Sequence, residues 1–226
     1  MSTRAGIERE LRIALVAMIE GDTVSADVAS ISDDVVTLDT GGGANFAPRD
    51  IVVMTGANAG HVASVVLVDG DDVTLSVEPP EGTPDGDTID AGVVAFLRAA
   101  TGDEQTVYLE PLIGPDPVER LKAPEAGPRC VAKLKIWPDV MTSTHRSRAE
   151  VEIEVSGRDV EYVEAATRAL VVLFHGSADD IAEEIGDPSD VWEVSAPQVV
   201  EVDNAMGIIT RAVQFDVISA AAEVAV

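Results

Sequence analysis

The sequence predicts an α+β protein in which a small all-β barrel is inserted beside an antiparallel sheet with packed helices. Two observations support this fold class. Between residues 23 and 98, short apolar runs alternate with Gly, Asp and Pro, which is typical of a small barrel. The rest of the chain combines helical periodicity with strictly alternating runs, the pattern of helices that cover one face of a sheet.

The first predicted element is a helix over residues 6–20. Its apolar residues fall at helical spacing: Ile7, Leu11, Ala14, Leu15, Met18 and Ile19. Gly21 and Asp22 end the helix. We assign residues 1–22 to this N-terminal helix and expect it to pack with the C-terminal module.

Residues 23–98 predict the inserted barrel, of SH3-like or similar type, with five or six strands. Strands are expected over 24–31, 35–38, 51–54, 62–68 and 73–77, and the run 89–97 closes the module. Asp69-Gly70-Asp71-Asp72 is expected to form a hairpin turn, because it lacks the downstream Glu of a calcium loop.

Residues 99–226 predict the α+β module. Its expected strands cover 107–113, 129–137, 149–155, 192–194, 199–203 and 208–217, with Pro138 as the stop of the second. A long helix is expected over 160–174, and a short helix or turn over 178–185. Residues 114–128 contain four prolines and predict an extended arm or loop.

A strand, turn and helix over 149–175 form the clearest unit of this module. Apolar and acidic residues alternate from Ala149 to Val155, so Val151, Ile153 and Val155 are expected on the face that meets the helix. The helix stripe is Val163, Ala166, Thr167, Leu170, Leu173 and Phe174. Asp159 suits the N-cap, and Gly176 suits a positive φ after the helix.

The charge balance is strongly acidic, with 41 Asp and Glu against 15 Lys and Arg and a formal charge of −26. We interpret it as adaptation to high salt, where the repulsion between carboxylates is screened. An ordinary acidic surface is the alternative, and the apolar patterning argues against disorder. Nucleic acid is an unsuitable direct ligand because a phosphate binder needs a basic stripe. The short basic strand 129–135 is expected to meet an acidic neighbour, such as another copy.

The sequence predicts no enzyme, and no catalytic, cofactor-binding or metal site. Gly41-Gly42-Gly43 precedes neither a helix nor a Lys-Ser/Thr pair, so a phosphate loop is not expected. His61, His145 and His175 lie in different elements without ligand spacing. Cys130 is the single cysteine, and we expect a buried, unreactive thiol.

No transmembrane or leader segment is expected. No stretch approaches the ~20 apolar residues of a membrane span. The N-terminus lacks the apolar core of a signal peptide. We therefore expect a soluble protein that stays inside the producing cell until assembly or lysis.

The order of elements resembles that of the tail terminator and tail completion proteins of long-tailed viruses. That order is helix 6–20, strand 129–137, strand 149–155, helix 160–174 and hairpin 199–217. The run 149–157, leading into the long helix, and the closing run 207–217 carry the resemblance. It covers the N-terminal helix and most of the C-terminal module, and the barrel is the departure from the pattern.

The resemblance implies a virion structural protein that forms a homo-oligomeric ring, commonly a hexamer, at the head–tail junction or neck. Such a ring caps the tail tube and joins it to the head-side connector, while DNA passes through the lumen. Assembly would occur in the host cytoplasm, and the acidic composition points to a tailed virus of a halophilic archaeon. Two alternatives stay open: a head–tail adaptor or connector ring, and a non-viral barrel that binds a peptide or glycan.

The arm 114–128 suggests how copies would join. A proline-rich segment loses little entropy when it lies across a neighbour. We expect Leu121, Val131 or Ile136 to supply the apolar contacts of that interface, since high salt would screen charge attraction.

Overall fold

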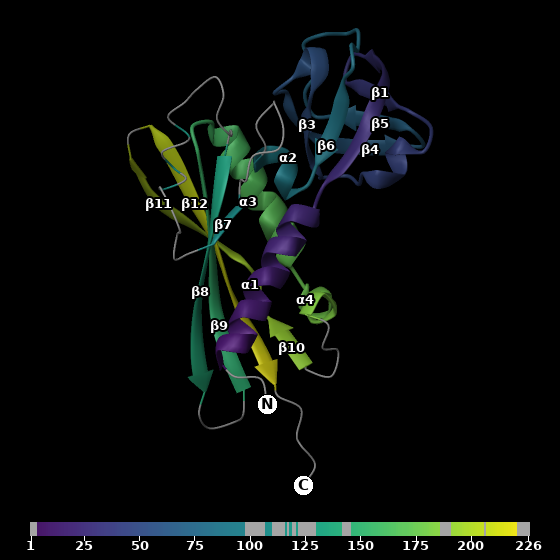
Figure 1. Ribbon diagram of the computed structural model, residues 1–226. Coiled ribbons are helices and arrows are strands. Elements are labelled where there is room, and N and C mark those ends of the chain that lie inside the picture. Colours follow the sequence, from purple (N-terminus) through teal and green to yellow (C-terminus); the bar gives the residue numbers. More distant parts are fainter. Residues whose placement is uncertain are drawn as a thin grey trace.

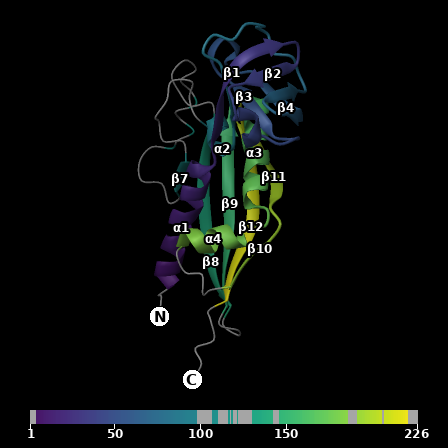
Figure 2. The ribbon, with the colours of Figure 1, turned by 90° about the vertical axis from the view of Figure 1, so that its right-hand side faces the viewer.

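The computed structural model describes residues 4–97, 107–109, 116, 118, 121, 130–141, 146–185, 191–205 and 207–220. It is an α+β structure with two sheets, both dominated by antiparallel pairing, as the sequence predicted. A barrel lies at one end of the molecule, and a long sheet with helices on one face makes up the rest (Figures 1 and 2).

Helix α1 (Arg4–Gly21) leads into the barrel, whose strands close in the order β1-β2-β5-β4-β3-β6. They are β1 (Val24–Ser32), β2 (Val35–Leu38), β3 (Ile51–Met54), β4 (Val62–Asp69), β5 (Asp72–Leu75) and β6 (Thr88–Ala91). Two 3₁₀ turns, η1 (Gly42–Asn45) and η2 (Gly56–Asn58), lie in its connections. The expected runs 35–38 and 51–54 are confirmed, whereas β5 ends at Leu75 instead of Val77.

The run 89–97 does not continue as one strand, so this expectation was wrong. β6 ends at Ala91, and helix α2 (Val93–Leu97) follows. Between them Gly92 has a φ of +91°, a conformation that other residues rarely adopt. The turn directs α2 out of the barrel and onto α3 (Val160–Phe174), where Phe96 meets Tyr162 edge to face.

The second sheet has the strand order β10-β12-β9-β8-β7, with β11 also paired to β12. Its strands are β7 (Val107–Leu109), β8 (Cys130–Met141), β9 (Arg146–Gly157), β10 (Val191–Val194), β11 (Gln198–Ala205) and β12 (Ile208–Ala220). β7 pairs with β8 in parallel, and the remaining pairs are antiparallel. β7 was predicted over 107–113, of which 110–113 lie outside the described residues.

Pro138 does not end β8, contrary to the prediction. Within the described residues β7 pairs with positions 132–134 only, so at Pro138 the described part of the chain places one strand, β9, beside β8. The carbonyl of Ile136 accepts a hydrogen bond from the Arg12 guanidinium at 3.4 Å, so it points away from β9. Backbone groups of residues two apart in a strand point in the same direction, so those of Pro138 also point away from β9. A proline, which has no N–H, is tolerated at such a position.

The core between the sheet and α3 follows the predicted pattern. Val151, Ile153 and Val155 are buried in one cluster with Leu170 and Phe174. The Asp159 carboxylate accepts from the Glu161 N–H, which confirms the N-cap, and Gly176 has the expected positive φ. α1, α3 and helix α4 (Ala178–Ile185) cover the same face of the sheet (Figure 2).

The apolar residues expected at an interface between copies are instead buried within the chain. Leu121 packs with Val131 and Ile208 on the face of the sheet opposite α3, and Ile136 belongs to the main core. The arm therefore lies on its own sheet at Leu121, because Val131 and Ile208 leave an apolar surface there. The other residues of 114–128, apart from Asp116 and Val118, lie outside the described residues.

Candidate functional site

The chain passes twice between the barrel and the sheet module, and the two passages lie side by side. Asp22 follows α1 on the way into the barrel, and Val93 begins α2 on the way out. The Asp22 carboxylate accepts a hydrogen bond from the Val93 N–H at 2.8 Å. A Cβ on Gly92 would lie 2.3 Å from the Asp22 carbonyl oxygen, so this close approach requires glycine.

The electrostatic setting of Asp22 is unusual for a carboxylate. Burial raises the pKa of Asp22 above 3.8, the hydrogen bond from Val93 opposes this shift, and the negative charge of Asp50 adds to it. Asp50 itself accepts from the Ala47 N–H at 2.7 Å. Each carboxylate thus accepts a hydrogen bond from a backbone N–H group at the junction.

A cleft with a volume of about 630 Å³ opens beside this junction, between the barrel and α3. Its apolar lining comes from the barrel, α3 and β11: Val24, Ile51, Val65, Ala91, Ala169, Val171, Val172, Leu173 and Val199. Val172 is 74% exposed and Val199 is 51% exposed, although both are aliphatic. The volume falls within the range of ligand and peptide sites.

Two exposed arginines line the same cleft. Arg49 lies on the barrel, where its φ of +84° is uncommon for a residue with a side chain, and its N–H donates to the Val65 carbonyl. Arg168 lies on α3. Within the described part of the chain, neither guanidinium has a carboxylate oxygen within ion-pair distance.

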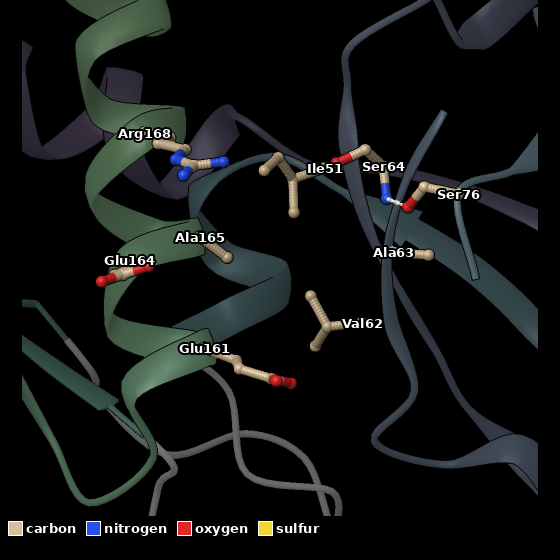
Figure 3. A pocket seen from close by; sticks show the side chains of 9 residues that line it. All are labelled: Ile51, Val62, Ala63, Ser64, Ser76, Glu161, Glu164, Ala165 and Arg168. Atoms are coloured by element: carbon tan, nitrogen blue, oxygen red, sulfur yellow. Dashed lines mark hydrogen bonds between the residues drawn. The ribbon is translucent and has the colours of Figure 1, made fainter. Parts of the chain in front are cut away.

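A smaller hollow of about 170 Å³ continues along α3 and shares Ile51, Ser64 and Arg168 with the cleft. Figure 3 shows the Arg168 side chain directed across the gap toward the barrel, whereas Glu164 points away from it. On the barrel wall the Ser64 N–H donates to the Ser76 hydroxyl at 2.9 Å. The i, i+4 spacing of Glu164 and Arg168 therefore produces no ion pair here, and the guanidinium faces the cleft.

The two lysines of the basic strand meet an acidic neighbour within the chain, strand β9, while Arg129 lies outside the described residues. Lys135 lies 3.0 Å from a Glu152 oxygen and 2.5 Å from a Glu154 oxygen, and Lys133 lies 3.3 Å from Glu154. Burial alone would lower the pKa of Lys135 and raise that of Glu154. The hydrogen bonds and charges of the pair outweigh burial, so the pKa of Lys135 is raised and that of Glu154 is lowered.

The glycine loop and the aspartate turn form one structural feature. The N–H groups of Gly41 and Gly43 donate to the Asp71 carboxylate, at 2.9 and 3.3 Å. Asp69 pairs with Asp72, so Gly70 and Asp71 form the predicted hairpin turn. The loop thus holds a carboxylate of its own chain at the position where a phosphate loop would hold its ligand.

The other sequence candidates remain apart. His61 contacts the Val77 carbonyl, His175 follows α3 at the surface, and His145 lies outside the described residues. Cys130 is buried, as predicted. Among the described residues no three His, Cys, Asp or Glu side chains are grouped closely enough to hold a metal ion. None of the described helices combines the length and apolar character needed to cross a bilayer.

Sequence reasoning missed the cleft and its arginines. Its walls come from stretches near residues 23, 50, 65, 91, 170 and 199, and nothing in the local patterns links them. Val172 was an available signal, because it is an apolar residue off the buried stripe of α3. Compared with protein-family models and with curated proteins, the sequence matches none of them at a significant level.

Proposed function

We propose that this protein is a virion structural protein that forms a homo-oligomeric ring at the head–tail junction of a tailed virus, as a tail terminator. The proposal rests on one observation. α1, β8, β9, α3, β11 and β12 follow one another in the order given by the resemblance and build a single helix-covered sheet. The SH3-like barrel enters between α1 and this sheet and leaves the order of the other elements unchanged.

The surface charge agrees with this role. A ring around DNA has to let the duplex slide, and a lumen lined by carboxylates repels phosphate. Among the described residues of the sheet, Lys133 and Lys135 are paired with β9, and Arg148 is paired with Asp216 at 2.7 Å. A chain of formal charge −26 therefore offers DNA little that would bind it.

The mass of the full-length protein in about 3 M KCl tests the proposal, since repulsion between copies is then screened over less than about 3 Å. Light scattering should give one defined integer multiple of the monomer mass, as expected of a closed ring. Negative-stain images should show rings. The protein should also be found at the neck of purified particles. A monomer at every salt concentration, together with absence from particles, would contradict it.

A binding module is the second candidate, and the cleft beside the barrel favours it. Its volume and mixed lining suit a peptide segment. In that case the protein would stay monomeric or dimeric in molar salt, so the same mass measurement separates the two functions. An adaptor ring would instead be distinguished by its place in the particle.

A further inference from the structure

We propose that the cleft between the barrel and α3 is the joint between successive copies, and that it receives an acidic, partly apolar surface of the next copy. This inference rests on the proposed ring and names its contact site. Val172 and Val199 expose aliphatic surface on its walls, at 74% and 51% exposure. Exposed apolar surface that gathers at a groove is typical of an interaction site.

The charges of the cleft identify the kind of partner. Asp22 and Asp50 accept hydrogen bonds from backbone N–H groups of this chain, and each is at least half shielded from solvent. Arg49 and Arg168 are exposed, and neither has a carboxylate partner among the described residues. The carboxylates and guanidinium groups of the lining balance in number, but the guanidinium groups are the more exposed, so the charges nearest to an incoming surface are positive, in a chain whose formal charge is −26. A second copy presents carboxylates over most of its surface and is the complementary partner.

This complementarity also fixes the symmetry of the contact. Two clefts are poor partners for each other, because the exposed charges of both are arginines. The cleft of one copy must contact a different, acidic surface of the next, which is a heterologous contact. Repeated head-to-tail contacts of this kind close into a ring when the rotation per copy allows it. An isologous dimer is therefore not expected.

Val172→Asp and Val160→Asp form a matched pair for the test. Both valines are exposed residues of α3, but only Val172 lines the cleft, and Val160 is 42% exposed at the start of the helix. In about 3 M KCl, Val172→Asp should raise the dissociation constant between copies by about tenfold or more, since it adds a charge to a desolvated contact. Val160→Asp should assemble like the parent. Thermal melts of both variants show whether each is folded.

Arg168→Glu supplies the electrostatic arm of the test. It should weaken assembly more at about 0.5 M KCl than at about 3 M, because the attraction it reverses is screened in high salt. Val172→Asp should weaken assembly at both concentrations. A photo-crosslinker at position 172 should join the cleft to an acidic segment of a second copy, while one at position 160 should not.

The outcomes separate this inference from the proposed function. If the parent forms rings and folded Val172→Asp forms them equally well, the cleft is not the joint, although the ring stands. If crosslinks from position 172 reach position 172 of another copy, the contact is isologous and the inference is wrong. If the parent is monomeric at every salt concentration, both fail. If the parent forms rings, Val172→Asp does not, and the parent protein is absent from viral particles, the result would support the cleft as the joint and contradict the viral function.

Discussion

The carboxylate of Asp22 accepts a hydrogen bond from the N–H of Val93 across 71 residues of sequence. This contact links the two passages of the chain between the barrel and the sheet module. The chain enters the barrel after Asp22 and leaves it before Val93. It caps the first turn of α2, whose N–H groups have no partner inside the helix. Asp22 thereby acts as an N-cap supplied from a distant part of the chain.

Asp22→Ala should lower the free energy of unfolding by about 0.5–2 kcal/mol, the usual cost of losing an N-cap. Asp22→Asn keeps an acceptor of the same shape and removes a charge that burial disfavours, so it should cost less. Urea denaturation at pH 7 measures both. An unchanged stability of Asp22→Ala would show that the hydrogen bond to Val93 contributes nothing.

The pair Lys135–Glu154 should make stability depend on pH. The pKa of Glu154 is lowered in the folded state, so its contribution is complete above 4.5 and is lost as the pH falls through the folded pKa. The raised pKa of Lys135 gives a contribution that is complete below 10.5 and is lost as the pH rises through the folded pKa. The raised pKa of Asp22 acts in the opposite sense to Glu154, since its contribution is present below 3.8 and is lost as the pH rises.

Glu154→Gln should therefore destabilise the protein at pH 7, and the difference from the parent should shrink as the pH falls below 4.5. Glu201→Gln is the control, because Glu201 is 84% exposed and lies 3.5 Å from Arg211 in a weak surface pair. Denaturation curves at several pH values measure the effect. A difference that stays constant with pH would mean that Glu154 is not stabilised as a carboxylate.

The unit from β9 to α3 could be predicted because neighbouring residues in the sequence determine it. A period of two fixes which face of β9 is buried, and the change of period after Asp159 marks the start of α3. α2 could not be predicted in this way, since Val93–Leu97 is too short an apolar run to show a period. Its helical form depends on Gly92 and on the remote cap from Asp22.

The remaining differences have tertiary causes. A proline ends a strand only where its missing N–H is needed, and among the described residues no strand pairs with β8 on that side at Pro138. Lys133 and Lys135 looked available in the sequence, but the register of β8 and β9 places Glu154 and Glu152 directly opposite them. The cleft requires segments far apart in the sequence to meet, so no local pattern could indicate it.

Leu170→Ala should lower the free energy of unfolding by about 2–5 kcal/mol, because Leu170 is fully buried between α3 and the sheet. Glu164→Ala is the matched control on the same helix, where the side chain is exposed and points away from Arg168 (Figure 3). It should leave stability almost unchanged. Chemical denaturation compares the two, and similar losses would mean that the buried face of α3 is misassigned.

Leu121→Ala tests whether the arm belongs to its own subunit. Leu121 is 2% exposed against Val131 and Ile208, so its truncation should destabilise the isolated monomer by about 2–5 kcal/mol. If the arm instead lay across a neighbour, the loss would appear only under conditions in which copies assemble. Denaturation of monomeric Val172→Asp, with and without Leu121→Ala, distinguishes these cases.

The final prediction concerns salt. The formal charge is −26, and the negative charges lie closer together in the folded chain than in the unfolded chain. Their repulsion therefore destabilises the folded state. Because salt screens this repulsion, the melting temperature should rise steeply between about 0.1 and 3 M KCl. Ion pairs such as Lys135–Glu154 oppose this trend only weakly, because they are partly buried and screened less than surface charges. The repulsion among many exposed carboxylates therefore determines the sign. A flat melting temperature would contradict adaptation to high salt.

A variant with fewer charges separates screening from the general strengthening of apolar burial by salt. Glu164, Glu183 and Glu184 are exposed on α3 and α4, and changing all three to Gln removes negative charge without touching the core. If screening is the cause, this variant should melt higher than the parent at low salt, and its melting temperature should rise less with KCl. If salt acts through apolar burial, the two slopes should be the same, since the buried area is unchanged.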